Sequence, residues 1–410
     1  MKDEGNVKKG NNMPNGELRI VGKNKRILNI LTLILVLGLG LLIRKEFIWY
    51  ASRDWTGFFE LWINEISNQG FKALAGNFYD YAPAYMYLLV IAAQFGARSM
   101  VAMKLISVCF DFILAVAAGL VVYEIRKRES LSMLVFSIVW LAPTVISNSS
   151  MWGQCDAIYV SFLMLTVLFL IKDKSRTAMV FYGIAFAFKL QALFWLPVMI
   201  LLWLYKKIKT IDFLWIPLMY FISIVPAWIA GRSFSELLGI YFAQAGAYAE
   251  RLSMKYPNIY YIIGELNLLE WYSGAGKFFA VGVILLFMVA LIYKLMGTRL
   301  TPELLLLICY SQGSLALYFL PQMHERYGYF IEIIAIILGV LNIKMFWVPI
   351  VHILITFITY SYYYNYESPK NIPIFVLALC MLALMLFMVY KTVAYKEKGE
   401  MKGYETAGEN

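Results

Sequence analysis

Long apolar runs are the feature that most constrains how this chain can fold. Examples are Ile27–Ile43 and the segments 104–124, 157–171 and 371–391. The runs are continuous and do not alternate between apolar and polar residues as the strands of a membrane β-barrel would. With 61% hydrophobic residues and a mean hydropathy of +0.68, the chain lies outside the usual composition of soluble globular proteins. The pattern therefore predicts an all-α, multi-pass membrane protein.

Lys and Arg cluster beside the ends of the apolar runs, and such clusters mark the cytoplasmic side. We place 126–128 and 172–176 inside, which puts 148–156 outside. The first run follows basic residues and has no small-residue cleavage site after it, so we predict an uncleaved anchor. The apolar runs suggest about twelve spans with both termini in the cytoplasm of a cell-membrane protein. Because the net charge of +10 follows this pattern, it does not indicate a nucleic-acid partner.

The runs predict one multi-span membrane domain with little sequence outside it. Residues 1–22 are polar and are expected to form a disordered cytoplasmic tail, 23–395 the membrane domain, and 396–410 a second tail. The predicted outer loops are 44–103, 148–156 and 231–276. The sequence shows no internal repeat and no soluble domain.

Two segments are predicted to depart from simple spans. In the first outer loop, aromatic and aliphatic residues recur at helical spacing, which predicts an amphipathic helix in the membrane interface: Trp55, Phe58, Phe59, Trp62 and Ile66. The Tyr79–Tyr87 stretch leads into an apolar run too short for a full span. Segment 177–205 is basic at both ends, so we expect two short helices that meet at Lys189–Gln191 and line a cavity.

The most informative stretch is Ser147–Asp156, which joins the apolar runs 131–146 and 157–171 and ends in the motif Trp152-Gly153-Gln154-Cys155-Asp156. A carboxylate and an amide at hydrocarbon level cost several kcal/mol unless something uses them, which favours a functional role. The alternative is a polar turn in which Asp156 caps the next helix.

Charged residues converge with this motif on the predicted outer side, namely Asp54, Lys189 and the stretch His324-Glu325-Arg326. Carboxylates and cations together at a membrane surface suit a substrate that is both lipid-embedded and anionic, such as a lipid-phosphate sugar. Arg326 would bind the phosphate in a fork and Lys189 would supply a compact charge. A carboxylate could accept a proton from the attacking hydroxyl while cations stabilise the departing phosphate.

Each of these residues has a structural alternative. Asp54 would cap the helix that follows it, and Asp80 would form a turn in its Tyr-Asp-Tyr-Ala-Pro context. Lys189 would extend along a long helix towards water, and residues 324–326 would form an interfacial salt-bridge cluster. The single acids Asp111 and Glu332, which lie inside apolar runs, are expected to be paired structurally.

No cofactor is predicted. Cys109, Cys155, Cys309 and Cys380 include no C-x-x-C pair, so neither a disulfide framework nor a zinc site is supported. The chain has 2 histidines and no Asp-x-Asp pair, which leaves a firmly bound divalent metal without support.

Four motifs occur in an order that resembles a known family: Trp152–Asp156, the Phe188–Gln191 break with Pro197 downstream, Pro257–Tyr260, and Met323–Tyr327. Together they resemble the bacterial relatives of the PIG-V mannosyltransferase of GPI-anchor synthesis, which are GT-C fold glycosyltransferases. The similarity covers roughly residues 45–340. Each motif alone is weak, and the set is more specific than its members. Cys155 stands where a larger residue is expected, which leaves the shape of the local pocket open.

The resemblance implies transfer of a sugar, usually mannose, from a polyprenyl-phosphate donor on the outer face of the membrane, with inversion. Asp54 matches by position the catalytic acid of the first outer loop, and Asp156 the acid of the second. Asp156 is also expected to position substrate or to hold Lys189 and Arg326. The residues expected to bind substrate are Asp80, Trp152, Gln154, Lys189, Gln191, Asn258, Tyr260, His324, Glu325 and Arg326. The acceptor, whether glycan, lipid or protein, is not identified, nor is a partner subunit.

Two other functions remain open. A transporter or flippase of lipid-linked saccharides would place ionisable residues near the bilayer midplane and often has two related halves, and neither feature is evident. A polysaccharide polymerase or ligase would be expected to carry its long loop late in the chain, whereas here the first loop is long. ATP-driven transport is disfavoured because no G-x-x-x-x-G-K-[S/T] loop occurs.

Overall fold

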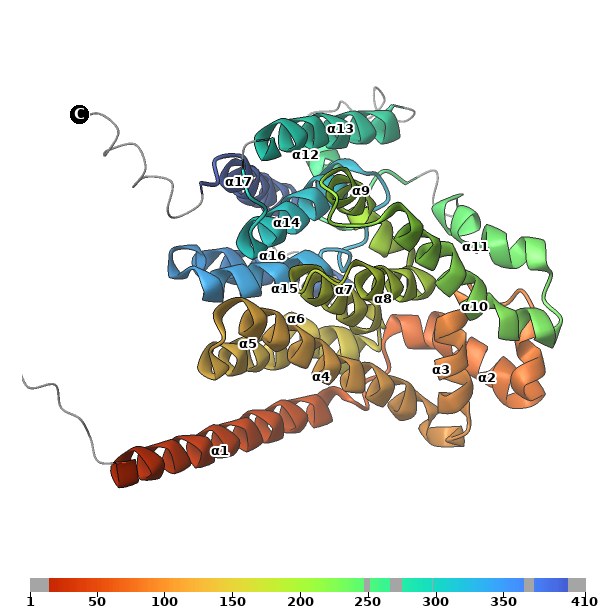
Figure 1. The fold of residues 1–410 in the computed structure, drawn as a ribbon. Coiled ribbons are helices and arrows are strands. Elements are labelled where there is room, and N and C mark those ends of the chain that lie inside the picture. Colours follow the sequence, from red (N-terminus) through yellow and green to blue (C-terminus); the bar gives the residue numbers. More distant parts are fainter. Residues whose placement is uncertain (1–14, 247–250, 266–274, 297, 365–371, 397–410) are drawn as a thin grey trace, which may run out of the picture.

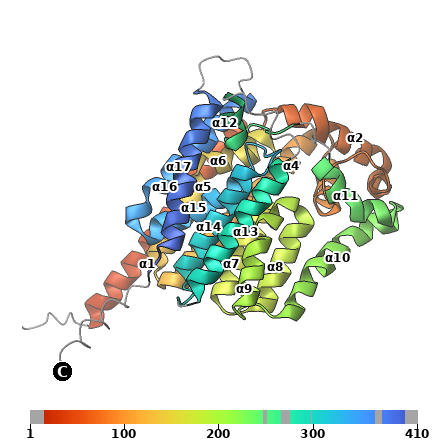
Figure 2. The same cartoon turned by 90° about the horizontal axis from the view of Figure 1, so that it is seen from above.

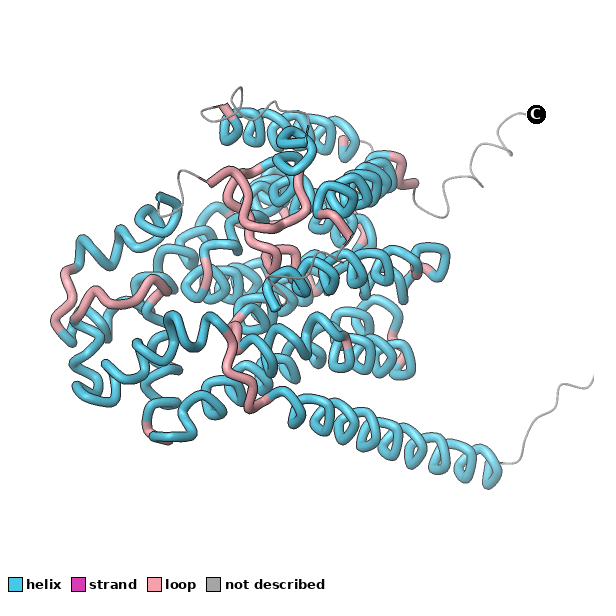
Figure 3. The backbone as a smooth tube through the Cα atoms, turned by 180° about the vertical axis from the view of Figure 1, so that it is seen from behind, coloured by secondary structure: helices cyan, strands magenta, loops and turns pink. Residues whose placement is uncertain are grey.

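The computed structural model describes residues 15–246, 251–265, 275–296, 298–364 and 372–396, and helices account for most of them (Figure 1). The first helices are α1 (Asn15–Phe47), α2 (Glu60–Gln69), α3 (Pro83–Ala93), α4 (Ser99–Arg126), α5 (Glu129–Leu141), α6 (Pro143–Ile146), α7 (Asp156–Ile171) and α8 (Ser175–Phe188). The later ones are α9 (Leu196–Leu204), α10 (Trp215–Ala230), α11 (Phe234–Gly246), α12 (Ile259–Glu265), α13 (Gly276–Leu295), α14 (Pro302–Phe319), α15 (Tyr329–Leu341), α16 (Trp347–Tyr364) and α17 (Ile374–Val393). Figure 3 shows short loops joining them.

The centre of the molecule is α14, which is buried continuously from Leu304 to Tyr318. A helix that is buried on all sides needs small residues where its neighbours come close. At Gly313 an added Cβ would lie 2.5 Å from Ile331 on α15, so only glycine allows these two helices to pack as they do. α14 packs against α13, α15 and α17, whereas α4, α7 and α8 pack against one another in sequence.

By length and composition, 6 helices of the described residues could cross a membrane, and the bent pair 129–141 and 143–152 would make 7. Four shorter apolar helices lie at 83–93, 156–171, 190–204 and 329–341. The expected count of about twelve spans is therefore not confirmed, because several apolar runs form helices too short for a plain span. Which side faces outward stays a prediction from the charge pattern.

The break predicted at Lys189–Gln191 is confirmed. α8 ends at Phe188, Lys189 adopts an extended backbone with φ −155° and ψ 132°, and a 3-10 helix, η5 (Leu190–Trp195), leads into α9. The hydroxyl of Tyr182 donates to the carbonyl of Ala192 at 2.9 Å and so ties the two halves together.

The loop predicted to be the first outer one, residues 44–103, packs largely against the protein. Its amphipathic segment is a π-helical turn, Trp55–Phe59, followed by α2. Trp55, Phe59 and Trp62 are buried, with Phe59 and Trp62 in ring contact with Tyr81, whereas Phe58 is exposed. Most of the apolar face of this segment is covered by α3 and by the turn before α3, residues 70–75. The prediction of a helix lying in the membrane interface is therefore corrected for that covered part. Figure 1 shows α2, α3, α10 and α11 on the side away from the N-terminal end of α1, and Figure 2 shows the same for α2, α10 and α11.

The chain ends differ in part from the predicted tails. α1 begins at Asn15, so residues 15–22 belong to a helix and not to a disordered tail, because the helix continues beyond its apolar stretch. Residues 1–14 and 397–410 lie outside the described residues, as do 247–250 and 266–274 of the last predicted outer loop.

Candidate functional site

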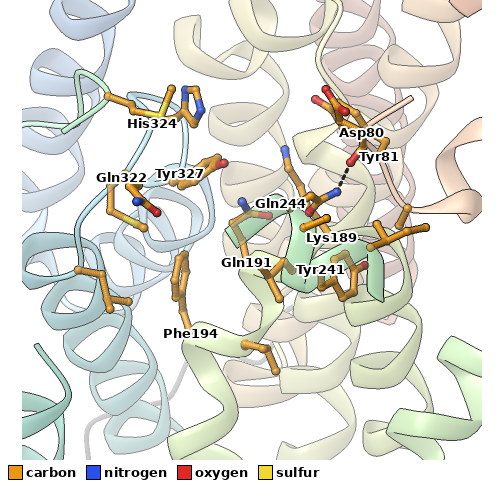
Figure 4. A pocket seen from close by; sticks show the side chains of 18 of the residues that line it. Asp80, Tyr81, Lys189, Gln191, Phe194, Tyr241, Gln244, Gln322, His324 and Tyr327 are labelled. Carbon is orange, nitrogen blue, oxygen red and sulfur yellow. Dashed lines mark hydrogen bonds between the residues drawn. The ribbon is translucent and has the colours of Figure 1, made fainter. Parts of the chain in front are cut away.

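A cavity of about 1640 Å³ opens where several distant segments meet (Figure 4). Its polar wall combines residues of the first outer loop, the α8–η5 break and the loop between α14 and α15: Asp54, Asp80, Lys189, Gln191, His324, Glu325 and Arg326. Aromatic and aliphatic residues form much of the rest, among them Phe188, Phe194, Pro197, Val281 and Ile284. The cavity therefore joins a charged region to a hydrocarbon-like one.

The Trp152–Asp156 motif has an unusual backbone that explains its composition. Residues Ser147–Trp152 form a π-helical turn, η4, which ends at Gly153 with φ +81°. A Cβ at Gly153 would lie 2.8 Å from Met103 and would require a left-handed conformation that side chains disfavour. The chain then enters α7, whose first residue is Asp156.

Asp156 is fully buried and binds cations from two other segments. Its carboxylate pairs with the ammonium of Lys189, accepts a hydrogen bond from the Asn148 amide at 2.9 Å, and lies 3.6 Å from Nε of Arg326. The start of α7 further favours a negative charge here. No side chain caps α7, since Cys155 occupies the N-cap position, so the capping alternative for Asp156 is wrong. Asp156 does not line the cavity. It contacts Lys189 and Arg326, which do line it, and so fixes their positions.

Asp54 lines the cavity, half-buried, and its carboxylate is held by donors from two directions. Oδ2 accepts from the Trp152 indole at 2.8 Å and from the Gln154 amide, and Oδ1 accepts from the Tyr363 hydroxyl at 2.9 Å. The backbone N–H of Asp54 donates to the same Tyr363 hydroxyl at 2.7 Å. The alternative role of Asp54 as a helix cap is wrong, because Ser52 accepts the first free helical N–H, that of Trp55, at 3.2 Å.

Further contacts attach the motif to the first outer loop. Lys104 on α4 donates to the carbonyls of Tyr50 at 2.6 Å and Met151 at 3.1 Å. Ser52 donates to the carbonyl of Trp152 at 2.7 Å. These bonds fix the position of Asp54 relative to the motif. The motif therefore holds Asp54 in place and also contains the second acid, Asp156.

Trp152 and Gln154 do not line the cavity but contact residues that do. The Trp152 ring stacks on Tyr363 with centroids 4.0 Å apart and lies 5.3 Å from the Arg326 guanidinium carbon. Gln154 accepts from the Tyr81 hydroxyl at 3.0 Å while its amide N–H donates to Asp54. Both residues were expected to bind substrate. In the structure they are buried and orient the groups that face the cavity.

The loop between α14 and α15 presents His324, Glu325 and Arg326 to the cavity. Backbone bonds to Met254 hold it: Met254 N–H donates to Met323, and Glu325 N–H donates to Met254, each at 3.2 Å. Burial, then the charge of Arg326 and further that of Lys189, lowers the pKa of His324 well below its usual 6.5. Burial also raises the pKa of Glu325, against the influence of Arg326. Glu325 lies 3.9 Å from the His324 ring and 3.9 Å from the Arg326 guanidinium, so neither contact is a close one.

The remaining predicted residues divide between the cavity and the scaffold. Asp80 is exposed on the cavity wall, and its backbone carbonyl accepts from the Gln244 side chain (Figure 4). Gln191 lines the cavity and is 9% exposed. Lys189 is likewise buried and paired, so it does not reach freely for water, as the snorkelling alternative would require.

Asn258 and Tyr260 are not among the residues that line the cavity, and their expected substrate-binding role stays a prediction. Asn258 accepts from the Tyr260 N–H at 3.3 Å at the start of α12, and the Tyr260 hydroxyl donates to the Phe319 carbonyl at 2.9 Å. Asn258 therefore stabilises the start of α12, and Tyr260 ties α12 to the end of α14. Asn258 fits a helix-capping role, which its residue type favours.

Several residues of the site are absent from the prediction. Tyr363 lies in an aromatic stretch at the end of α16, Asn148 lies just before the motif, and Gln312 is a lone amide in the apolar run of α14. Tyr81 adjoins Asp80 in the Tyr-Asp-Tyr turn. Gln312 could have been identified from the sequence, because an amide inside an apolar run is as costly as the polar residues of the motif.

The expected structural pairing of Asp111 is confirmed. Asp111 on α4 binds the buried Arg44 at 2.8 Å and accepts from Ser149 at 2.5 Å. Glu332 accepts a hydrogen bond from Thr144. Within the described residues, no group of three or more His, Cys, Asp and Glu side chains is arranged to hold a metal ion.

Comparison with known proteins gives a partial similarity. The chain is 26% identical to GPI mannosyltransferase 1 of Saccharomyces cerevisiae over 146 residues, which is 34% of this chain and 34% of the yeast protein. The chain thus spans about a third of the length of that curated relative. No protein-family model matches the chain.

Proposed function

We propose that this protein is a membrane glycosyltransferase that moves a sugar, most simply mannose, from a polyprenyl-phosphate donor to an acceptor hydroxyl at the outer membrane face, with inversion. The observation that carries the proposal is the shared support of Asp54 and Arg326 by the Trp152–Asp156 motif at one cavity wall. The similarity to a yeast mannosyltransferase supports the same class of reaction. The order of the four motifs supports the finer assignment to PIG-V-like enzymes.

Asp54 is the proposed general base. Its Oδ1 accepts one hydrogen bond, from Tyr363, so this oxygen retains acceptor capacity on the cavity side. The acceptor hydroxyl would give its proton to Asp54 as its oxygen forms a bond to the anomeric carbon. The bond from that carbon to the phosphate oxygen breaks, and the lipid phosphate leaves with the electron pair. Attack opposite the leaving phosphate gives inversion.

Arg326 is the proposed ligand of the leaving phosphate. Its Nε has no hydrogen-bond partner among the described residues, although Asp156 lies 3.6 Å away. A guanidinium held in this way can bind a phosphate with its remaining donors. Lys189 pairs with Asp156 at a shorter distance than Arg326 does, so its charge is more fully neutralised. Its main role is therefore to hold the Asp156 carboxylate in place. Lys255 and Arg251 add positive charge to the same cavity.

The apolar part of the cavity suits the donor's isoprenoid chain. Phe194 and Pro197 from the η5–α9 segment face the same space as Val281 and Ile284 of α13. Burial of such hydrocarbon contributes about 25 cal/mol for each Å² removed from water. A charged wall next to an apolar wall is what a lipid phosphate requires.

The test is a transfer assay with the full chain in lipid nanodiscs and a short-chain polyprenyl-phosphate [³H]mannose. The expected result is protein-dependent transfer of label to an acceptor from the cell envelope, with inverted anomeric configuration in the product. Retained configuration would contradict the mechanism. Movement of intact lipid-linked sugar across the bilayer without transfer would favour the flippase instead.

A further inference from the structure

The cavity wall contains two buried side-chain amides that the proposed reaction does not use. Gln312 of α14 is fully buried, and neither its Nε2 nor its Oε1 has a hydrogen-bond partner among the described residues. Gln191 of η5 is 9% exposed, and its Oε1 also lacks a partner there. Both residues line the cavity. Buried polar atoms without partners are costly, so two such amides among the residues that line one cavity point to a missing ligand group.

A direct contact joins the two segments that carry the amides. Trp195 of η5 donates to the Cys309 carbonyl of α14 at 2.9 Å, which fixes the register of the two segments. Gln191 lies four residues before Trp195 in η5 and Gln312 lies three residues after Cys309 in α14, so the two amides come from adjoining segments of the cavity wall.

They occupy an intermediate level of the cavity. Figure 4 shows Gln191 on the wall between Lys189 and Phe194. On α14 the cavity-lining positions are Gln312 and Ala316, one helical turn apart, and Leu320 follows just after the helix; Gln312 is the farthest of them from the charged loop. The amides are thus separated from the cations by uncharged residues, and they adjoin the apolar region.

The donor and acceptor inventory selects the kind of group that would bind. The two unpartnered Oε1 atoms require donated protons, whereas the Nε2 atom of Gln312 requires an acceptor. A doubly ionised phosphate, an ester carbonyl and a hydrocarbon chain donate no proton. A hydroxyl both donates and accepts, and neighbouring hydroxyls can serve several amide atoms together.

We propose that Gln191 and Gln312 form an uncharged polyol-binding subsite that takes the sugar hydroxyls of a lipid-linked substrate. This deepens the proposed function and rests on it for the identity of the substrate. The amides would select for the presence and arrangement of hydroxyls, while Arg326 binds the phosphate. Separate groups would therefore recognise the sugar and the charge.

The experiment uses the full chain in nanodiscs and tritiated octyl α-D-mannopyranoside, a neutral probe that bypasses the phosphate site. The variant is Gln191→Met/Gln312→Met, because Met has nearly the shape of Gln and lacks its hydrogen-bonding groups. The matched control is Gln322→Met, an amide of the same cavity in the loop after α14. 1-Octanol is measured alongside to account for binding through the alkyl chain.

The wild type is expected to bind the mannoside saturably, and the double variant at least about tenfold more weakly, as loss of two or three hydrogen bonds predicts. Binding of 1-octanol and binding by Gln322→Met should not change. The ligand-free double variant should melt at the same or a higher temperature, since it removes polar atoms that have no partner.

Absence of saturable binding to the wild type, or equal binding by the double variant, would overturn the subsite. An equal loss in Gln322→Met, or a lower melting temperature of the ligand-free double variant, would also count against it. The proposed function fails separately: mannoside binding that depends on the two amides, together with absence of transfer from the phosphate donor, would leave the subsite standing without the reaction.

Discussion

The indole N–H of Trp152 donates to the carboxylate of Asp54 at 2.8 Å, joining residues 98 positions apart in the chain. The bond links the motif before α7 to the turn before α2. It sets the direction of the carboxylate, because Gln154 and Tyr363 occupy the other protein-facing positions of the same group. The acid on the cavity wall is therefore oriented by side chains from two other segments, the motif before α7 and the end of α16.

Asp54→Asn is expected to lower turnover by about a hundredfold or more, because an amide cannot accept the hydroxyl proton. The melting temperature should change little, since the amide oxygen of the variant can still accept hydrogen bonds from Trp152 or Tyr363. Turnover with a polyprenyl-phosphate mannose donor and melting are measured on the same preparation. Glu60→Gln, an exposed acid in α2, is the matched control and should remain active. Near-normal turnover of Asp54→Asn would remove Asp54 as the base.

Trp152→Phe is expected to separate orientation from packing. Phe can still stack on Tyr363 but cannot donate to Asp54, and a hydrogen bond to a charged group contributes about 1.5–3 kcal/mol. We expect lower kcat with little change in donor KM, and a lower free energy of unfolding. Trp140→Phe is the control, because the buried Trp140 donates to the Val36 carbonyl far from the cavity. If both variants lost turnover equally, Trp152 would have no special role in orienting Asp54.

Asp156→Asn is expected to destabilise the protein by about 3–5 kcal/mol, because it leaves Lys189 buried without its anion. Lys189→Met should also destabilise the protein, because it leaves the buried carboxylate of Asp156 without the ammonium that pairs with it. The double variant should lose less stability than the sum of the two single changes, as expected for groups in direct contact. Denaturant unfolding in detergent micelles measures all three. Additive losses would mean that the pair is not coupled.

Arg326→Lys keeps the positive charge but removes the planar fork, so donor KM should rise about tenfold while kcat changes less. Steady-state kinetics with varied donor concentration measure this. Arg251→Lys, an exposed residue that also lines the cavity, serves as the control and should change KM little. Unchanged donor kinetics in Arg326→Lys would argue against bidentate phosphate binding at this residue.

His324 predicts a dependence of stability on pH. Its folded-state pKa lies well below 6.5 because of burial and then the charge of Arg326, with smaller effects of Lys189, Lys255 and Arg251. As the pH falls below 6.5, the unfolded chain takes up a proton at this position before the folded protein does. The free energy of unfolding should therefore decrease in this range, since the unfolded state binds more protons.

The measurement compares unfolding at about pH 7.5 and about pH 5.5 for the wild type and His324→Gln. The variant should lose less stability on acidification than the wild type. Glu325 acts with the opposite sign, because its raised pKa makes the folded protein take up a proton first as the pH falls. Glu325→Gln should therefore steepen the loss on acidification. An identical pH dependence in wild type and His324→Gln would contradict the buried, neutral state of His324.

Much of the scaffold could be predicted from local sequence. Hydrophobicity and charge are read residue by residue, so the apolar helices, the short α3 and the break at Lys189 could be found without a structure. The number of spans could not be counted reliably in this way. Segments such as 156–171 and 329–341 are apolar because they are buried against other helices, and burial in protein gives the same composition as burial in lipid.

The sequence by itself determined that this chain is helical, belongs in a membrane and carries costly polar residues at a few breaks. Only the tertiary structure decided what those residues do. It placed Asp54 on the cavity wall and Asp156 behind it, made Asn258 part of the scaffold, and brought Gln312 to the cavity. The physical reason is that a carboxylate or amide acquires its role from the donors and acceptors that meet it. Those partners, such as Trp152 for Asp54, come from distant segments whose approach is fixed by helix packing.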